Sequence, residues 1–264
     1  GTITGYTYDG NGNKLSMTEG VGSALEKTTT YTYTADNRVE TITTNSIANP
    51  GNQQVTTMSY DTAGNLLTRT ESGFQGTTPI SRTTTYTYNS YGQVTSIDGP
   101  RIDVSDTITI TYYPNEAAQG NNRSMLHTVS NSLGHVTTYA DYNVHGQAET
   151  ITAANGLVTT RTYTSKGLLS SSTTAGLTTS YVYNTAGELQ SITQPGGRTI
   201  TYGYDSGGRV NRITDNEGNY ITYSYDSEGR KTGEEIHDPA GSLVRFAGFE
   251  YNDNGYLSKE TLPG

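Results

Sequence analysis

Hydrophobic and polar positions alternate along this chain in short runs. In residues 197–204, Ile200, Tyr202 and Tyr204 fall on one face of an extended segment, while threonines and a glycine fall on the other. A period of two is that of a β-strand. The pattern therefore predicts a strand with one aromatic and aliphatic face.

A turn and a second strand follow this first strand. Residues 205–208 read Asp-Ser-Gly-Gly, in which Asp205 can accept hydrogen bonds from the turn and Gly208 can supply a positive φ. The chain then returns through Val210 and Ile213, which are three residues apart where strict alternation needs two or four. That offset predicts a β-bulge in the return strand. It recurs at Leu189 and Ile192, Val94 and Ile97, and Val39 and Ile42.

The same unit recurs along the whole chain, as an aromatic residue, any residue, a tyrosine and then a glycine four positions later. Full copies contain Tyr6, Tyr8 and Gly12; Tyr86, Tyr88 and Gly92; Tyr181, Tyr183 and Gly187; Tyr202, Tyr204 and Gly208; and Tyr223, Tyr225 and Gly229. Variant copies contain Tyr31 and Tyr33 with Asn37 in place of glycine, Tyr60 and Gly64, Tyr142 and Gly146, Tyr163 and Gly167, Tyr251 and Gly255, and the degenerate pair Tyr112-Tyr113, counted at Tyr113. We interpret these residues as the structural positions of a repeat.

The spacing of the copies defines the organisation. Successive second tyrosines are 25 to 29 residues apart up to Tyr142, then mostly 20 or 21. We expect one array of about eleven repeats over residues 1–264, with long repeats carrying loop insertions in 1–138 and mostly near-minimal repeats in 139–264. One such insertion is Asn45 to Gln54. The chain starts without Met or a leader, so we expect any export signal to lie outside it.

Each repeat holds two strands, so the array predicts about 22 strands. One hairpin is marginal alone, and repeats gain stability by packing on their neighbours. A twisted open sheet rarely carries so many strands without curling. We therefore expect an all-β fold in which tandem hairpins form a long, strongly curved antiparallel sheet.

Composition agrees with a folded β protein. Leu, Ile, Val and Phe number only 43 of 264, about 16%. A content below about 20% is typical of disordered chains. Disorder also requires a high net charge, and −9 is small for this length. The chain instead has 48 Thr and 22 Tyr, which favour strands.

Charge and cysteine content exclude several classes. The chain has no Cys, which removes disulfides and thiolate chemistry. Only 16 Lys and Arg are present, scattered singly, and the pI is about 4.9, so we expect no nucleic-acid partner. No run approaches 18 apolar residues, and we expect no membrane-spanning helix.

The unit Gly-x4-Tyr-x-Tyr-Asp-x2-Gly-Arg, seen in residues 197–209 and 218–230, resembles the YD repeat of Rhs proteins. The resemblance extends from Tyr6 to about Leu257. It implies hairpins wound into a spiralling sheet that forms a hollow shell, of which this chain would be a part. In bacterial polymorphic toxins and C components of ABC toxins the shell encloses a C-terminal toxin, and in teneurins it is an extracellular scaffold for adhesion.

The chain departs from the bacterial family pattern after the shell. Asp238-Pro239-Ala240-Gly241 only superficially resembles the DPxGL-like motif of the self-cleaving core, because repeats resume at Phe249. We interpret Asp238 as a loop residue. Shell closure, autoproteolysis and toxicity are not expected from these residues.

Other candidate chemistry has a structural explanation. Residues 9–13 alternate oxygen side chains as calcium loops do, but they lack the terminal bidentate carboxylate, and we interpret them as a hairpin turn. Asn122-Arg123-Ser124 is a glycosylation sequon of the kind that arises by chance. The histidines, interpreted as structural or exposed because they lack ligand spacing, are His127, His135, His145 and His237. We expect no catalytic residue, cofactor or metal.

Two functional hypotheses follow. The first is a non-catalytic segment of a secreted shell that encapsulates, protects or presents a polypeptide, with the rest of the same polypeptide and an enclosed effector as partners. The alternative is an exposed cell-surface module that is adhesive, carbohydrate-binding or fibre-forming, with glycans or neighbouring subunits as partners. The tyrosine rows could stack on sugars, but they share their face with Ile, Val and Leu, which favours packing. Exposed edge strands would invite end-to-end pairing.

Overall fold

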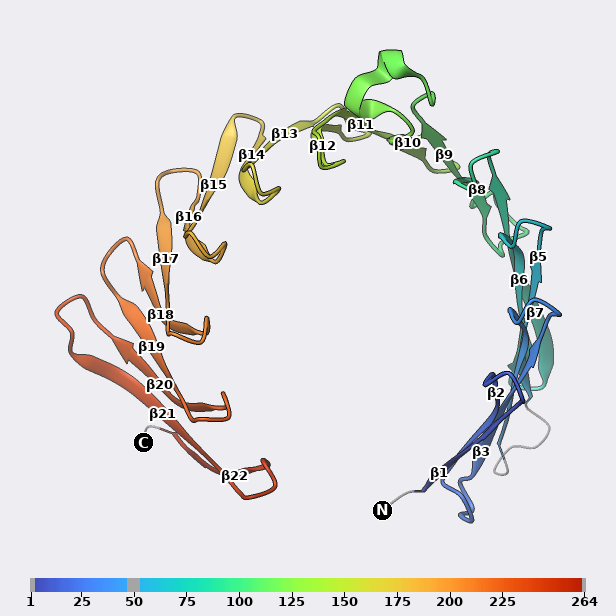
Figure 1. Ribbon diagram of the computed structural model, residues 1–264, viewed down its shortest axis with the longest axis horizontal. Helices are drawn as coiled ribbons and strands as arrows, with labels where there is room; N and C mark the ends of the chain where they lie inside the picture. Colours follow the sequence, from blue (N-terminus) through green and yellow to red (C-terminus); the bar gives the residue numbers. More distant parts are fainter. Residues whose placement is uncertain (1–2, 47–52, 263–264) are drawn as a thin grey trace. The chain divides into compact units, whose positions relative to one another are not determined.

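The computed structural model describes residues 3–46 and 53–262, which contain 22 strands and one short 3₁₀ helix. The chain divides into two compact units, Gly1–Thr138 and Tyr139–Gly264, and strand β11 crosses the boundary (Figure 1). Every pairing described below is antiparallel and joins strands that are consecutive in the sequence. The predicted all-β class with tandem hairpins is thus confirmed.

The first unit is a run of hairpins. Its elements are β1 (Thr4–Tyr8), β2 (Lys14–Glu19), β3 (Lys27–Tyr33), β4 (Val39–Ser46), β5 (Gln54–Tyr60), β6 (Leu66–Gln75), β7 (Thr78–Tyr88), β8 (Val94–Asp98), β9 (Ile108–Tyr112), η1 (Ala117–Asn122), β10 (Leu126–Ser130) and the start of β11 (Val136–Tyr142). Each strand from β1 to β10 pairs with the next. The hairpins therefore lie side by side in chain order (Figure 1).

The second unit repeats this arrangement with shorter connections. Its strands are β12 (Ala148–Thr152), β13 (Val158–Tyr163), β14 (Leu169–Thr174), β15 (Leu177–Tyr183), β16 (Leu189–Thr193), β17 (Thr199–Tyr204), β18 (Val210–Asp215), β19 (Tyr220–Tyr225), β20 (Lys231–His237), β21 (Leu243–Tyr251) and β22 (Leu257–Thr261). Each strand from β12 to β21 pairs with the next.

The predicted bulges are present in the return strands. In the β17–β18 hairpin, Gly203 pairs with Arg212 and Tyr204 pairs with Val210, which leaves Asn211 as the extra residue. The bulge returns Val210 to the face that holds Ile213, which pairs with Tyr202. The four offsets seen in the sequence correspond to register shifts between Tyr33, Tyr88, Tyr183 or Tyr204 and the residue before it.

Most of the turns between successive strands share one geometry, with β2–β3, β6–β7 and β14–β15 among the exceptions. The Asp205 N–H donates to the Arg209 carbonyl at 2.9 Å, and the Gly208 N–H donates to the Asp205 carbonyl at 3.1 Å. Gly208 has a φ of 75°, and Asn37, which replaces glycine in its turn, has a φ of 59°. These are left-handed conformations, which explains the choice of Gly or Asn at this position.

The protein has no conventional core within the described residues. The hydrophobic side chains below 9% exposure are Tyr142 and Ala247, at 8% each, and one threonine, Thr29, is equally covered. The repeat tyrosines from Tyr31 onwards are otherwise half-buried. Stability therefore comes from packing between adjacent strands and repeats, as expected for a repeat array.

One repeat position differs from the sequence alignment. Strand β9 ends at Tyr112, and the Tyr113 N–H donates to the Met125 carbonyl at the base of the loop that carries η1. Tyr112, not Tyr113, is therefore the last strand residue of this copy, because the inserted loop begins one residue earlier than the pair of tyrosines suggests. Of the predicted insertion Asn45 to Gln54, residues 47–52 lie outside the described residues.

Candidate functional site

In nine repeats within the described residues, the last tyrosine of the first strand is hydrogen-bonded to the preceding repeat. The Tyr204 hydroxyl donates to the backbone carbonyl of Leu189, the first residue of the previous return strand, at 2.7 Å. We call this series of bonds the tyrosine ladder. Its other members within the described residues are Tyr33 to Lys14, Tyr60 to Val39, Tyr88 to Leu66, Tyr112 to Val94, Tyr163 to Ala148, Tyr183 to Leu169, Tyr225 to Val210 and Tyr251 to Lys231, at 2.7 to 3.3 Å.

The ladder bonds lie where backbone pairing between repeats stops. Between β16 and β17 the paired residues run only from Thr193 with Thr199 to Ser191 with Thr201. The Leu189 carbonyl lies two residues beyond the last pair, and the Tyr204 hydroxyl reaches it. A tyrosine buries a large ring and still offers a donor, so each repeat satisfies a carbonyl of its neighbour.

The arginine that follows the turn glycine contacts its own turn, the tyrosine of the next repeat and the next turn. Arg209 Nε donates to Asp205 Oδ2 at 2.7 Å, and its guanidinium carbon lies 4.8 Å from the centre of the Tyr225 ring. Its Nη1 donates to the Asp226 carbonyl of the next turn at 3.3 Å. The same contact with the next repeat's tyrosine is made by Arg230 over Tyr251 at 4.9 Å and by Arg38 over Tyr60 at 5.9 Å. We call this arrangement the arginine clamp.

In other turns a polar side chain substitutes for the arginine. Asn65 Nδ2 donates to Asp61 Oδ2 at 2.8 Å, so the first and fifth turn residues remain linked. The hydrogen bond from the Asn65 side chain lowers the pKa of Asp61, and the backbone N–H of Arg209 lowers the pKa of Asp205. Equivalent pairs are Asn13 with Asp9, Gln93 with Asn89, Gln147 with Asn143, Glu188 with Asn184 and Asn219 with Asp215.

The opposite face of the sheet carries pairs of hydroxyls. Thr32 Oγ1 and Thr41 Oγ1 lie 2.8 Å apart on neighbouring strands. Similar exposed pairs are Thr7 with Ser16, Ser59 with Thr68, Thr70 with Thr83, Thr87 with Thr95, Thr111 with Thr128 and Thr173 with Thr178. Such pairs stabilise a sheet modestly, which gives the abundant threonine a role beyond strand propensity.

The remaining repeat residues are the first tyrosines of the repeats and the turn glycines. Tyr6 and Tyr8 on β1 are 51% and 58% exposed, whereas the first-position tyrosines Tyr31, Tyr86, Tyr181, Tyr202 and Tyr223 are half-buried. The turn glycines Gly12, Gly64, Gly92, Gly146, Gly167, Gly187, Gly208, Gly229 and Gly255 have φ between 73° and 93°.

The other candidate residues make structural contacts. His237 stacks on Tyr220 with ring centres 4.6 Å apart, and His127 packs on Tyr113 at 4.3 Å. Asp9 accepts hydrogen bonds from Asn11 and Asn13, as a turn residue does. Asp238 occupies the first position of the turn between β20 and β21, as predicted. Among the described residues, no group of three His, Asp or Glu side chains could hold a metal.

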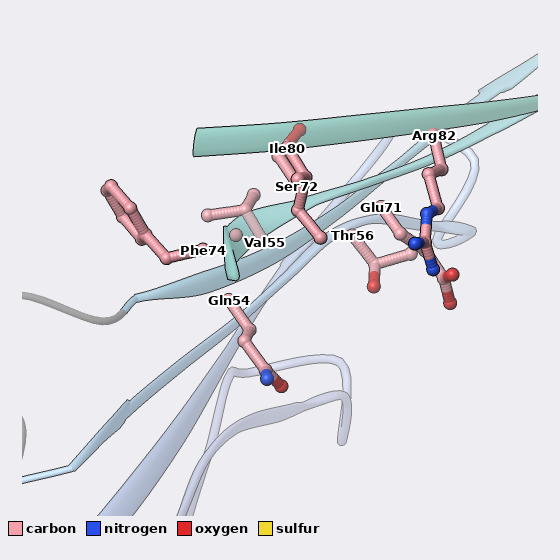
Figure 2. Close-up of a pocket in the computed structure, with 9 residues that line it drawn as sticks. Gln54, Val55, Thr56, Glu71, Ser72, Phe74, Ile80 and Arg82 are labelled. Atoms are coloured by element: carbon pink, nitrogen blue, oxygen red, sulfur yellow. The ribbon is translucent and has the colours of Figure 1, made fainter. Parts of the chain in front are cut away.

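Several cavities open on the sheet. Figure 2 shows one of about 230 Å³ over β5, β6 and β7, where Phe74 and Ile80 lie at one end and Glu71 and Arg82 at the other. Glu71 and Arg82 are cross-strand partners, so a negative and a positive side chain stand at paired positions on adjacent strands. Larger grooves of about 640 and 510 Å³ lie between successive turns, at Tyr88 and at Tyr183.

The chain matches one protein family in sequence and several solved structures in fold. Residues 183–219 match the family described as RHS Repeat. A structure of the Photorhabdus luminescens Tc holotoxin pore matches with a TM-score of 0.68 at 17% identity, over 99% of this chain and 15% of that one. A crystal structure of TcdB2–TccC3–Cdc42 matches with a TM-score of 0.64 at 17% identity, over 97% of this chain and 15% of that one. No curated protein sequence matches.

These likenesses show the fold. The chain spans about 15% of the length of the solved chains it matches. The matched family segment covers the β16–β17–β18 region, which contains Tyr204, Arg209 and the turn between them. Among the described residues, no helix has the length and apolar character needed to cross a membrane.

Proposed function

We propose that this chain, which matches the RHS Repeat family over residues 183–219 and shares its fold with the Tc holotoxin structure, is a non-catalytic segment of a secreted shell that encloses and protects a polypeptide, typically a toxin. The observation that carries this proposal is the tyrosine ladder. A wall one sheet thick has no core to stabilise it, and each ladder bond links a hairpin to its neighbour by a side chain as well as by the backbone.

The residues that could carry chemistry support a non-catalytic role. The aspartates of the turns are engaged by the fifth turn residue, as Asp205 is by Arg209. His237 is held between Tyr220, Glu235 and the Gly241 carbonyl. These groups are used in structure, and a wall needs no others.

The partners of such a segment are the rest of the same polypeptide and the enclosed effector. The solved chains that share the fold are far longer than this chain, which supports its place within a larger wall. One of the similar structures is a Tc holotoxin pore, which supports secretion and a toxin as cargo.

Limited proteolysis of the full gene product tests the proposal. Thermolysin is expected to cleave the wall and the enclosed segment of the wild-type protein only slowly. In the triple variant Tyr183→Phe/Tyr204→Phe/Tyr225→Phe it should cleave the enclosed segment faster. Equal cleavage of that segment in both proteins, with the variant still folded by circular dichroism, contradicts encapsulation.

The alternative is an exposed adhesive, carbohydrate-binding or fibre-forming module. The observation that favours it is the row of exposed hydroxyl pairs and the exposed Tyr6 and Tyr8. A glycan array separates the two proposals: specific binding that Tyr6→Ala or Tyr8→Ala removes would support the exposed module.

A further inference from the structure

The groove at Tyr88, between the turns at residues 61–65 and 89–93, lacks the side chain that fills its equivalent elsewhere. In the repeat of Arg209, the guanidinium lies over Tyr225, and a Cβ on Gly229 would be 3.3 Å from Nη1. The guanidinium thus occupies the space between one turn and the glycine of the next. Arg230 lies in the same way against Gly255, at 3.6 Å.

At Tyr88 the equivalent turn residue is the shorter, neutral Asn65. A Cβ on Gly92 would be 3.5 Å from Asn65 Oδ1, and the Asn65 amide turns back to Asp61. The space that a guanidinium would occupy is part of a groove of about 640 Å³. This volume lies within the range of about 300–1,000 Å³ typical of ligand sites.

The groups that hold the guanidinium in the arginine clamp all remain in this groove. Asp61 corresponds to Asp205, Tyr88 to Tyr225 and the Asn89 carbonyl to that of Asp226, since both carbonyls accept from the turn glycine. Asp61 keeps an ionised carboxylate, because the hydrogen bond from Asn65 lowers its pKa. Each carboxylate oxygen can accept more than one hydrogen bond, so Asp61 can accept from a guanidinium as well.

Two further tyrosines add aromatic surface to the groove. Tyr86 lines it from β7, and Tyr91, in the turn itself, is 64% exposed. Aromatic faces attract cations, arginine more often than lysine. The groove therefore combines an anion, three aromatic side chains and a carbonyl acceptor.

We propose that this groove binds the guanidinium group of an arginine side chain from another polypeptide segment, in the way the chain binds its own Arg209 and Arg230. The site does not depend on the shell proposal, because it requires only the two turns. The groove at Tyr183 is the internal contrast: its preceding turn offers Thr164 and Leu168, with no carboxylate in the position of Asp61.

A titration with Nα-acetyl-arginine methylamide tests the site, with the Tyr ring resonances of the 264-residue chain followed by NMR. We expect saturable shifts of the Tyr88 resonances with the arginine compound. Binding of the lysine analogue should be about three- to fivefold weaker, and the uncharged citrulline analogue should cause no shifts. Asp61→Asn is expected to weaken binding about fivefold or more.

The decisive variant is Asn65→Arg, which supplies the guanidinium from within the chain. It is expected to abolish the shifts at Tyr88 and to raise the thermal midpoint, since it adds an arginine clamp. The matched control is Leu168→Arg, which places an arginine at the Tyr183 groove and leaves binding unchanged. Undiminished binding by a folded Asn65→Arg protein, loss of binding in Leu168→Arg, or no saturable shift in the wild type would each overturn the proposal.

Discussion

Replacing Tyr204 by Phe removes one ladder bond and little else. The substitution keeps the ring and deletes the hydroxyl that donates to the Leu189 carbonyl at 2.7 Å. A typical intramolecular hydrogen bond contributes about 1 kcal/mol net. The Leu189 carbonyl is only part-buried and can be hydrated, so we expect a loss of about 1 kcal/mol rather than the larger cost of a buried unpaired group.

The ladder predicts that such losses add. Equivalent tyrosines are separated by two strand spacings, about 9–10 Å, at which mutational effects are usually additive. The triple variant Tyr183→Phe/Tyr204→Phe/Tyr225→Phe should therefore lose about 3 kcal/mol. Each of these hydroxyls has its own acceptor in a different repeat.

Urea unfolding followed by circular dichroism measures the total effect, and hydrogen exchange of β16–β18 measures it locally, since a repeat array can unfold in steps. The matched control is Tyr8→Phe. Tyr8 has the same place in its repeat but is 58% exposed, and its hydroxyl has no partner among the described residues. If Tyr204→Phe costs no more than Tyr8→Phe, the ladder does not stabilise the array.

Three further results are expected. Gly156 has a φ of 81° and open space around a new Cβ, so Gly156→Ala should cost about 1–2 kcal/mol by thermal unfolding from backbone strain alone, while Gly10→Ala, in equally open space without a positive φ, should cost far less. Arg209→Lys should lower the free energy of unfolding by about 0.5–1 kcal/mol, because an ammonium lacks the planar guanidinium that pairs with Asp205 and covers Tyr225. The control is Arg245→Lys at an exposed arginine. Equal urea midpoints for the two variants would refute the arginine clamp. The pKa values of Asp61, Asp205 and Asp215 are lowered in the folded state, so their contribution is present above about pH 4 and is lost as pH falls through the folded-state values; urea midpoints between pH 6 and pH 2 should decline below about pH 4, and a flat profile there would contradict this.

Much of the fold could be predicted from the sequence because its local rules repeat. The alternation around Tyr202 and Tyr204 predicts the strand, and the three-residue offset of Val210 and Ile213 predicts the bulge. The Tyr112-Tyr113 copy was misplaced by one residue, because it was assigned to the second tyrosine of the pair, although the alternation of Ile108, Ile110 and Tyr112 already places Tyr112 on the aliphatic face.

The contacts between repeats could not be predicted in the same way. The acceptor of the Tyr204 hydroxyl is a backbone carbonyl, which every residue carries and no sequence pattern marks. The arginine clamp depends on which turn lies beside Arg209, and this follows from the pairing of whole hairpins. The available signal was the Gly-Arg pair itself, which ends the turn at Gly208-Arg209 and at Gly229-Arg230 and is followed in each case by a repeat with a tyrosine.

Electron cryomicroscopy of the full gene product tests the central claim most directly. We predict that these hairpins form part of a continuous wall, joined through the ladder tyrosines, with polypeptide density enclosed behind it. A structure in which both faces of this sheet are open to solvent, with no enclosed polypeptide, would contradict the proposed function.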